Sequence, residues 1–344
     1  MNAGPARILD SLRRATGRTC SGQTLSGDLG VSRAQIWKHV QTLRNRGYEI
    51  HAEAGDGYRL DSVPDRLYPE EIQEGLGTHW LARRIHYFDS IDSTNRVALE
   101  LAREGAEHGI AVVAETQTAG RGRLGRSFHS PAFQNLYTSL VLRPDLTIAE
   151  APAWILAAAI AVANAIAATL EDDDAVEIKW PNDVLLSGLK TSGILMELGA
   201  EATRVDYLVL GIGVNLNVDR QTFPDEFRHL ATSLASHSGR RIDRIEFTRR
   251  LYTELETILD ACAKGGFDSV RGRFDERFKM RGRRVKVKQL DGRELSGTAL
   301  GIDADGALRL ELEAGGVCRV IAGDVTIVKD PIGHDGPSRR LKEA

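Results

Sequence analysis

Hydrophobic positions near the N-terminus recur every three or four residues, which predicts helices. A first helix is expected over Ala6–Arg14, and a second, short one includes Leu25 and Leu29. After a tight turn, Ser32 is a suitable N-cap for a third helix, because its hydroxyl can accept a hydrogen bond from a free backbone N–H. The inward positions of this third helix are Ile36, Val40 and Leu43.

The polar outer face of the third helix favours DNA binding. A helix, a tight turn and a helix with basic and amide side chains form a helix-turn-helix, and Tyr48–His51 and Tyr58–Leu60 around Gly55-Asp56-Gly57 predict a hairpin wing. Residues 1–66 carry ten Lys or Arg and seven Asp or Glu, whereas the whole chain has a net charge of -3. We therefore predict a winged helix-turn-helix DNA-binding domain over residues 1–66; the alternative is a helical interaction or dimerisation module. The expected DNA contacts are Ser32, Arg33, Gln35, Lys38, His39, Gln41 and Thr42.

Residues 67–278 alternate strand-like apolar runs with helical segments. The predicted strands are Arg84–Phe88, Ile110–Glu115, Asn135–Leu142, Glu177–Trp180, Gly193–Leu198 and Tyr207–Val214. The runs Leu136–Leu142 and Gly193–Leu198 are expected to be antiparallel neighbours. We therefore predict a mixed sheet with helices packed on it, and an α+β fold, rather than a doubly wound parallel sheet.

Two further patterns complete the domain organisation. Ala151–Leu170 is long enough to span a membrane, but it is mostly alanine and runs into four acidic residues, so a buried helix of a soluble domain is expected. Residues 279–330 alternate apolar and polar positions between Asp-Gly and Gly-Gly turns, which predicts a small, SH3-like antiparallel barrel. Residues 331–344 are predicted to form a polar tail.

Composition adds the expected cellular setting. The chain is 42% hydrophobic and 27% charged, which is ordinary for a soluble globular protein. Its three cysteines, Cys20, Cys262 and Cys318, have neither metal-ligand spacing nor the pattern of a disulfide framework. The first residues lack the features of a signal peptide. We expect a cytoplasmic protein with no membrane partner, and nucleic-acid binding confined to the basic head.

The stretch TAGRGRLGRSF at residues 118–128 interleaves three glycines with three arginines. Glycines let successive backbone N–H groups turn toward one anion, and arginines add forked, permanently charged donors. The stretch occurs once inside a folded domain, unlike repetitive single-strand binders, and it lacks the P-loop pattern. It favours a nucleotide-phosphate loop over a nucleic-acid binder or a merely solvated turn.

Four further motifs offer polar groups near predicted strand ends: DSIDSTN, KWPND, GLKTSGILMEL and LGIGVNLN. In KWPND, Pro181 turns the chain so that Asn182 and Asp183 face outward, where ligands commonly bind. Lys190 is expected just before an apolar strand. Each motif alone also has a structural explanation, because Pro-Asn-Asp favours a turn, a lone lysine is usually solvated and Ser-Thr-Asn can cap a helix.

Five motifs together resemble those of the biotin protein ligases, both in their residues and in their order along the chain. They are DSTN, ETQTAGRGRLGR, KWPND, GLKTSGILMEL and GIGVNLN. The head and the barrel extend the resemblance over the whole chain and match the bifunctional subtype, which also represses the biotin operon. The resemblance implies a central domain like class II aminoacyl-tRNA synthetases, with ATP and Mg²⁺. Biotinyl-5′-AMP would form first, and biotin would then pass to a lysine of the biotin carboxyl carrier protein of acetyl-CoA carboxylase. A homodimer formed with adenylate would bind operator DNA.

The resemblance also implies roles for individual residues. Lys190 would bridge the biotin carboxylate and the α-phosphate, while Asp183 would hold Mg²⁺ and is the candidate for assisting the attacking amine. The implied catalytic residues are Lys190, Arg121, Arg123 and Asp183. The implied biotin contacts are Ser93, Thr94, Asn95, Gln117, Arg121, Gly122, Arg123 and Lys190. The implied ATP or adenylate contacts are Gly120, Gly125, Arg126, Asn182, Asp183 and Asn215.

Two positions depart from the usual family pattern. Leu124 stands where many relatives have another arginine, which removes one charge from the loop, and Phe128 replaces a common tryptophan, which should keep an apolar contact with less area. Three other functions stay open: a lipoate-type ligase, a ligand-responsive transcription factor without catalysis, and a ligase with a vestigial head. KWPND together with GRGRxGR favours biotin, and the arginines with Lys190 favour catalysis.

Overall fold

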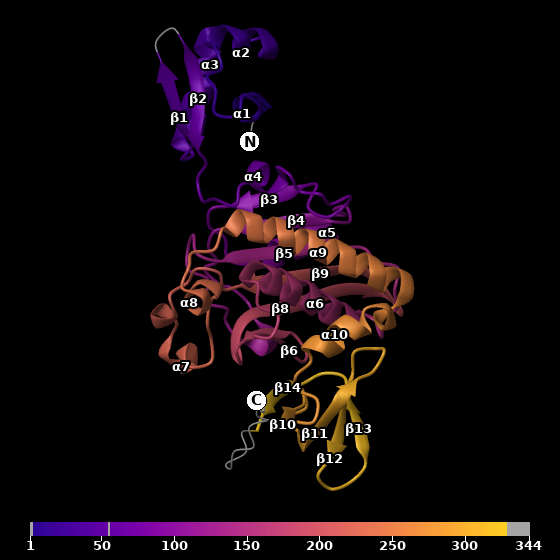
Figure 1. The fold of residues 1–344 in the computed structure, drawn as a ribbon. Helices are drawn as coiled ribbons and strands as arrows, with labels where there is room; N and C mark the ends of the chain where they lie inside the picture. Colours follow the sequence, from indigo (N-terminus) through magenta and orange to yellow (C-terminus); the bar gives the residue numbers. More distant parts are fainter. Residues whose placement is uncertain (1–2, 54–55, 329–344) are drawn as a thin grey trace, which may run out of the picture. The chain divides into compact units, whose positions relative to one another are not determined.

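The computed structural model describes residues 3–53 and 56–328, so the predicted polar tail at 331–344 lies outside the described residues. The described chain forms two compact units. One contains the N-terminal part up to Gly77 together with Asp243–Arg249, and the other contains residues from Thr78 to Ile242 and from Arg250 onward. Figure 1 traces the elements of both units along the chain.

The first unit contains the predicted winged helix-turn-helix. Its elements are α1 (Ala3–Arg14), α2 (Gly22–Leu29), α3 (Arg33–Asn45), β1 (Glu49–Glu53), β2 (Gly57–Ser62) and α4 (Pro69–Gln73). The Ser32 hydroxyl accepts a hydrogen bond from the backbone N–H of Gln35 at 3.2 Å, as expected for the N-cap of α3. The inward positions of α3 are buried, and β1 pairs with β2 in an antiparallel hairpin. The prediction of a winged head is confirmed.

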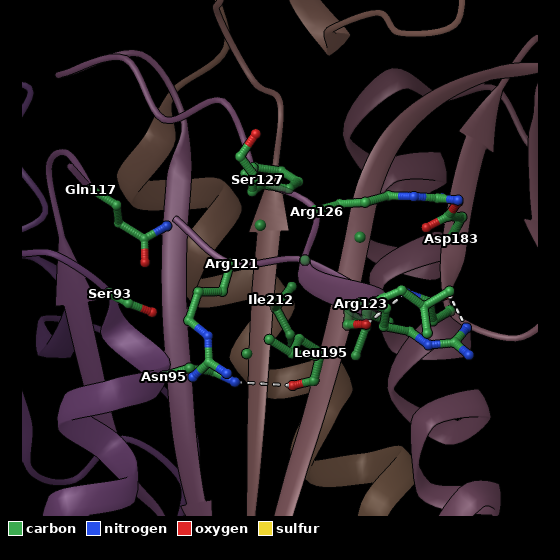
Figure 2. A pocket seen from close by; sticks show the side chains of 18 of the residues that line it. Ser93, Asn95, Gln117, Arg121, Arg123, Arg126, Ser127, Asp183, Leu195 and Ile212 are labelled. Carbon is green, nitrogen blue, oxygen red and sulfur yellow. Dashed lines mark hydrogen bonds between the residues drawn. The ribbon is translucent and has the colours of Figure 1, made fainter. Parts of the chain in front are cut away.

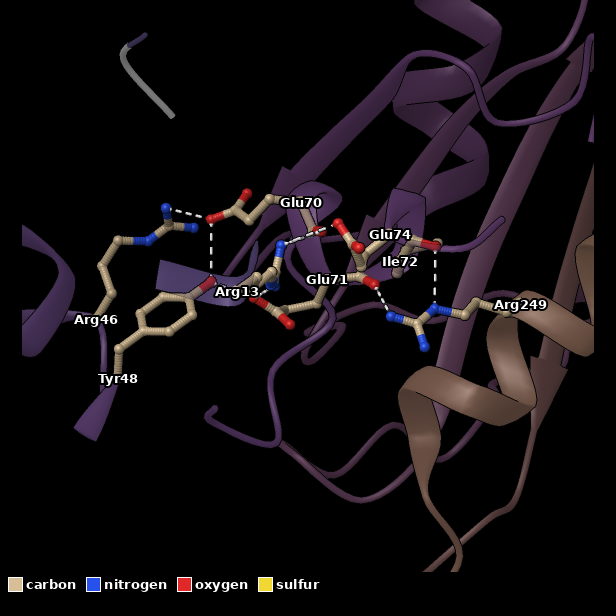
Figure 3. Close-up of polar contacts among 8 residues, drawn as sticks. All are labelled: Arg13, Arg46, Tyr48, Glu70, Glu71, Ile72, Glu74 and Arg249. Carbon is tan, nitrogen blue, oxygen red and sulfur yellow. Dashed lines mark hydrogen bonds and ion pairs between the residues drawn. The ribbon is translucent and has the colours of Figure 1, made fainter. Parts of the chain in front are cut away.

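A buried polar network ties α4 to the head (Figure 3). The Glu71 side chain accepts hydrogen bonds from Arg13 at 2.6 Å and from the Tyr48 hydroxyl at 2.5 Å. Arg249 of α9 (Arg244–Gly265) donates to the main-chain carbonyl oxygen of Glu71. A carboxylate that is 2% exposed needs such partners, because an unpaired buried charge is costly. The first turns of α9 therefore belong structurally to the same unit as the head.

The second unit is built on a seven-stranded mixed sheet in the order β3-β4-β5-β9-β8-β7-β6. Only β3 and β4 are parallel, and the other neighbouring pairs are antiparallel. The mixed sheet is confirmed, but the expectation that β5 and β8 are neighbours is wrong, because β9 lies between them and pairs with both. Strand β7 was not predicted. The strands are β3 (Ile85–Phe88), β4 (Ile110–Ala114), β5 (Leu136–Leu142), β6 (Val176–Lys179), β7 (Asp183–Leu186), β8 (Leu189–Glu201) and β9 (Arg204–Val214).

Helices cover both faces of this sheet. Ser139 of β5 bonds to residues of α5, whereas its neighbour Thr138 bonds to the Tyr252 hydroxyl of α9 at 2.8 Å. Successive strand residues point to opposite faces, so α5 and α9 lie on opposite sides of β5. The remaining helices are α5 (Thr94–Arg103), α6 (Ala151–Leu170), α7 (Asp225–Arg228), α8 (Leu234–Ser238) and α10 (Arg271–Arg277). Short 3-10 turns cover Arg123–Gly125, Arg220–Thr222 and Phe267–Ser269.

The alanine-rich segment forms α6, as predicted. Among the described residues it is the one helix long and apolar enough to cross a membrane, yet 72% of its most apolar window is buried in the protein. It packs against β6, β7, β8 and α10. The three cysteines are free thiols in the structure.

The C-terminal residues form a five-stranded antiparallel sheet in the order β13-β12-β11-β10-β14, which agrees with the predicted small barrel. The Trp180 indole N–H donates to the carbonyl oxygen of Gly306 at 2.9 Å and so fastens this barrel to the KWPND segment. The backbone of Gly306 passes so close to α6 that a Cβ there would lie 3.2 Å from the Ala153 nitrogen. The strands are β10 (Arg284–Lys288), β11 (Glu294–Ile302), β12 (Leu308–Leu312), β13 (Val317–Val320) and β14 (Asp324–Ile327).

Candidate active site

Most of the predicted site residues meet in one cavity above β8 and β9 (Figure 2). The cavity has a volume of about 110 Å³. The predicted residues in its lining are Ser93, Thr94, Asn95, Gln117, Arg121, Gly122, Arg123, Arg126, Asn182, Asp183 and Lys190.

Glycines form the floor of the cavity. Gly193 of β8 lies opposite Gly213 of β9, and the next pair on the same face is Leu195 and Gly211. A Cβ on Gly211 would lie 1.8 Å from the Asn95 Oδ1 atom, so only glycine allows the start of α5 to approach the sheet this closely.

One end of the cavity is a connected polar network at the N-terminus of α5. The Ser139 hydroxyl lies 2.8 Å from the Thr94 hydroxyl and 2.6 Å from Asn95 Oδ1. The Gln117 Oε1 atom accepts hydrogen bonds from the Thr94 N–H at 2.8 Å and its hydroxyl at 3.1 Å. Gln117 in turn donates to the Ser130 hydroxyl at 3.2 Å. Because these groups satisfy one another, this end is held in a fixed geometry.

The other end of the cavity is formed by the arginine loop. Each of the three arginines in this loop has a partner outside it. Arg121 pairs with Glu197 at 3.2 Å, and Arg123 donates to the Asn182 Oδ1 atom at 2.9 Å. Arg126 pairs with the barrel residue Asp324. In Figure 2 Arg123 and Arg126 extend toward the side of the cavity on which Asp183 lies, while Arg121 extends toward Asn95.

Lys190 belongs to the same end. Its Nζ atom lies 2.6 Å from the Asp183 Oδ1 atom, and its side chain lies over Gly193, where an added Cβ would be 3.3 Å from Nζ. The prediction that Lys190 precedes a strand is wrong, because β8 begins at Leu189. The strand was underestimated because Lys190 and Thr191 make its first residues polar. A β-bulge beside Lys190 interrupts the pairing with β7.

The electrostatics of the cavity follow from these pairs. Four cationic side chains face the three carboxylates of Glu197, Asp183 and Asp324. Burial raises the pKa of Asp324, but hydrogen bonds from Arg126 together with the positive charges of Arg126, Lys179 and Arg123 outweigh it and hold that pKa below its ordinary value. The same hydrogen bonds raise the pKa of Arg126, whereas burial lowers that of Arg123. An anionic ligand must therefore compete with Glu197 for Arg121 and with Asp183 for Lys190.

A second cavity of about 600 Å³ adjoins the first. Its apolar lining includes Phe223 and Phe227, and the predicted nucleotide residue Asn215 lies here rather than in the first cavity. The buried Asn215 Oδ1 atom has no hydrogen-bond partner among the described residues. A mostly apolar ligand would suit this space.

Two predicted nucleotide residues, Gly120 and Gly125, do not line the first cavity. A Cβ on Gly120 would lie 2.6 Å from the Phe128 carbonyl oxygen, so this glycine permits the base of the loop to close. Gly125 has a φ of +73° and turns the loop tip. Both glycines therefore shape the backbone of the loop and do not form the wall of the first cavity.

The two departures from the family pattern occupy different places. Leu124 is 55% exposed at the loop tip and has a φ of 57°, a conformation that non-glycine residues seldom adopt. Phe128 lines both cavities and packs on the glycine floor, because a Cβ on Gly213 would lie 2.6 Å from its ring. The expected apolar contact at position 128 is therefore present in the structure.

In the head, the predicted DNA contacts are not equally accessible. Ser32, Arg33, Lys38 and Thr42 are exposed, whereas Gln35, His39 and Gln41 are half-buried. The His39 ring lies against α1, since a Cβ on Gly4 would be 2.4 Å from its Nε2 atom. His39 therefore packs within the head. Trp37, 55% exposed on α3, was left out of the predicted DNA contacts.

The described residues contain no group of three or more His, Cys, Asp or Glu side chains that could hold a metal ion. Mg²⁺ at a nucleotide site commonly uses one or two carboxylates together with substrate phosphates. Asp183 lines both cavities and could supply one such carboxylate to a Mg²⁺ ion bound with the nucleotide.

Sequence reasoning missed Ser139, Glu197 and Asp324. Glu197 could have been found, because it follows Gly193 and Leu195 in the alternation that lines the cavity. Ser139 lies inside an apolar strand, and Asp324 lies about two hundred positions after the arginine loop in the sequence. Local sequence patterns carry no signal for either contact.

Comparison with known protein families divides the chain into three matching parts. Residues 6–59 match the HTH domain, residues 87–215 match the Biotin/lipoate A/B protein ligase family, and residues 282–328 match the Biotin protein ligase C terminal domain. A helix-turn-helix head is thus followed by a ligase domain and a ligase C-terminal domain.

Individual relatives extend this similarity over nearly the whole chain. The bifunctional ligase/repressor BirA of Bacillus spizizenii is 38% identical over 93% of this chain and 97% of its own. BirA of Escherichia coli is 32% identical over 90% of this chain and 93% of its own. A biotin protein ligase from Aquifex aeolicus, solved in complex with biotin and ATP, has a TM-score of 0.61 and 27% identity, and covers 72% of this chain and 100% of its own. The chain therefore belongs to the biotin protein ligases of the bifunctional ligase/repressor type.

Proposed function

We propose that the protein activates biotin with ATP and transfers it to a lysine of a biotin carboxyl carrier protein. The single observation that carries this is the two-ended cavity, in which a fixed polar network faces a cluster of Lys190 and three arginines. The first end suits the uncharged polar ureido group of biotin, since Asn95 and Gln117 offer paired donors and acceptors. The second suits the meeting of a carboxylate with a polyphosphate.

In the first step, a biotin carboxylate oxygen forms a bond to the α-phosphorus of ATP, and the bond to the β-phosphate breaks to release pyrophosphate. The carboxylate is already ionised at neutral pH, so this step needs charge neutralisation more than a base. Lys190 approaches the carboxylate and the α-phosphate, and Arg121 and Arg123 share the remaining charge. Asp183 is the residue that would hold a Mg²⁺ ion bound with the nucleotide, and that ion would supply further neutralisation of the phosphates.

In the second step, the carrier lysine amine attacks the carbonyl carbon of biotinyl-5′-AMP, AMP leaves, and the amine loses a proton. Asp183 is the candidate acceptor of that proton, and its ion pair with Lys190 must open for this role. Transfer from preformed biotinyl-5′-AMP tests the assignment. Asp183→Ala should slow this transfer; normal transfer with poor adenylate formation would assign Asp183 to the first step only.

The ligase assignment is tested by biotin-dependent exchange of pyrophosphate into ATP, followed by transfer to a carrier domain. Lys190→Gln should lower exchange by about 10²–10³-fold, as expected for a group that stabilises developing charge. Lys286→Gln, an exposed lysine of β10, is the matched control and should leave exchange unchanged. Exchange that follows added lipoate and not biotin would favour the lipoate-type alternative.

For the head, we propose repression of the biotin biosynthetic operon by a homodimer that forms with bound adenylate. Exposed Arg33, Lys38 and Thr42 on α3 support DNA contact through a major groove. Adenylate would order the arginine loop and favour the dimer, which places two heads on a two-fold operator. Operator affinity and sedimentation should both change when biotin and ATP are added. Operator affinity independent of both ligands would indicate a vestigial head.

A further inference from the structure

One turn of the C-terminal barrel holds two arginines of the predicted phosphate loop. Arg126 forms two hydrogen bonds to the carboxylate of Asp324, one of them with an Nη1–Oδ1 distance of 3.4 Å. Arg123 donates from Nη2 to the carbonyl oxygen of Gly323 at 3.2 Å. Both anchoring residues therefore come from a part of the chain that is remote in sequence from the loop.

This anchor is itself firmly fixed. Gly323 packs so closely on β10 that a Cβ there would lie 2.8 Å from Val287 Cγ1 and 2.9 Å from the Lys288 carbonyl oxygen. Asp324 starts β14 and pairs with Lys288 in the sheet. Side chains on regular strands are placed more exactly than those on loops, so Asp324 is a rigid support for a flexible partner.

The loop, by contrast, has little to orient its own side chains. At its tip, the backbone bonds are those from Gly122 N–H to the Arg126 oxygen at 2.7 Å and from Arg126 N–H to the Arg123 oxygen at 3.2 Å. The Arg126 side chain is 64% exposed. An arginine loses up to ~2 kcal/mol of rotamer entropy when it is fixed, and here the barrel partner fixes it before a ligand arrives.

Asp324 also lies at a functionally important position, because it lines both the first cavity and the second. Arg126 lines both as well. A guanidinium held at this junction can approach a polyphosphate that runs from one cavity to the other, and it has five N–H donors, of which the carboxylate engages only a part.

We propose that Asp324 is a positioning residue for nucleotide binding, which holds Arg126 at the junction of the two cavities so that its guanidinium faces the polyphosphate of ATP. The barrel thus acts on the first step of the reaction through a single ion pair. This inference rests on the ligase function proposed above and adds a residue to its nucleotide site.

The test is steady-state pyrophosphate exchange by the full chain, with KM for ATP and for biotin measured separately. Asp324→Asn should raise KM for ATP about tenfold, the scale of a lost charged hydrogen bond, and leave KM for biotin within twofold. Asp324→Glu, which restores the charge, should recover most of the loss. Glu313→Gln removes the carboxylate that pairs with Arg284 in the same barrel and should change neither constant.

A second arm asks whether Asp324 acts through Arg126. Arg126→Ala alone should raise KM for ATP, and adding Asp324→Asn to it should produce no further rise. A further tenfold rise in the double variant, an unchanged or lower KM for ATP in Asp324→Asn, or an equal rise for both substrates would overturn the proposal. Absence of exchange in the wild-type protein would instead overturn the ligase function, which separates the two failures.

Discussion

The two ends of the first cavity use polar side chains in opposite ways. At the α5 end, Thr94 bonds to Gln117, and the Ser139 hydroxyl bonds to both Thr94 and Asn95. At the loop end, the cations of a glycine-rich segment are bonded to carboxylates and amides supplied by distant parts of the chain. The first end is ready for an uncharged polar ligand, and the second is occupied by internal anions.

This difference has a consequence for binding order. A ligand that enters the α5 end finds its partners already aligned, so little ordering cost remains. A polyphosphate that enters the loop end must exchange with Glu197 or Asp183 before Arg121 and Lys190 can serve it fully, whereas Asp324 keeps its ion pair with Arg126. Glu197 contacts both Asn95 and Arg121. We therefore expect a ligand bound at one end of the cavity to change the binding affinity at the other end.

The largest effect is expected from a substitution that breaks the fixed end. Gly211→Ala would place a Cβ 1.8 Å from Asn95 Oδ1, and a displacement of about 1 Å near reacting groups can cost ~10²-fold in rate. We expect kcat/KM for biotin to fall by that order in the exchange assay. For Gly213→Ala the nearest neighbour is the Phe128 ring, a side chain that can rotate away, so the loss should be less than tenfold. Equal losses of kcat/KM for the two variants would contradict the distinction between a fixed site around Asn95 and an adaptable one around Phe128.

A smaller effect is expected at the residue that joins the two ends. Glu197→Gln keeps the shape of the side chain but removes the charge that pairs with Arg121 and accepts from Asn95. We expect KM for biotin to rise about tenfold, the scale of a charged hydrogen bond. Limited trypsin digestion should also cut faster after Arg121, because that side chain loses its partner. Unchanged values of both would show that Glu197 plays no part in joining the ends.

Ser139 tests the internal network alone. Ser139→Ala removes the hydroxyl shared by Thr94 and Asn95, and the free energy of unfolding should fall by about 1–3 kcal/mol in urea titration, together with a raised KM for biotin. Thr138→Val is the matched control, since its hydroxyl bonds Tyr252 on the opposite face. It should lower stability without changing KM for biotin; a raised KM in this control would mean that general loosening causes the effect.

The smallest expected effect concerns pH and the second cavity. Burial lowers the pKa of His129 below its ordinary value of 6.5, so the unfolded chain takes up a proton at a higher pH than the folded protein does. The free energy of unfolding should therefore decrease as pH falls below about 6.5. His129→Phe should make this decrease shallower between pH 7.5 and 5.5, by less than ~1 kcal/mol. Burial lowers the pKa of His86 and His108 as well, so part of the slope remains. An unchanged slope would contradict the account for His129.

Local patterns in the sequence predicted most of the elements, whereas the candidate site residues followed from the resemblance to the biotin protein ligases. Strand alternation, the cap at Ser32 and the alanine-rich helix depend on neighbours in sequence, and the structure contains all three. Sheet order depends on which strands meet in space, so β9 between β5 and β8 was missed. The carboxylates Glu197 and Asp324 were missed for a related reason, because ion-pair partners are selected by the folded geometry.

The central claim is that the α5 end is fixed before ligands bind, whereas at the loop end ligand anions replace Glu197 and Asp183 as partners of the cations. Amide hydrogen exchange of the full chain, with and without biotin and ATP, measures this most directly. We expect residues 94–97 to exchange slowly in both states, and residues 120–126 to exchange fast in the free protein and slowly with both ligands. Slow exchange of residues 120–126 in the free protein, or equal slowing of both segments by the ligands, would contradict the claim.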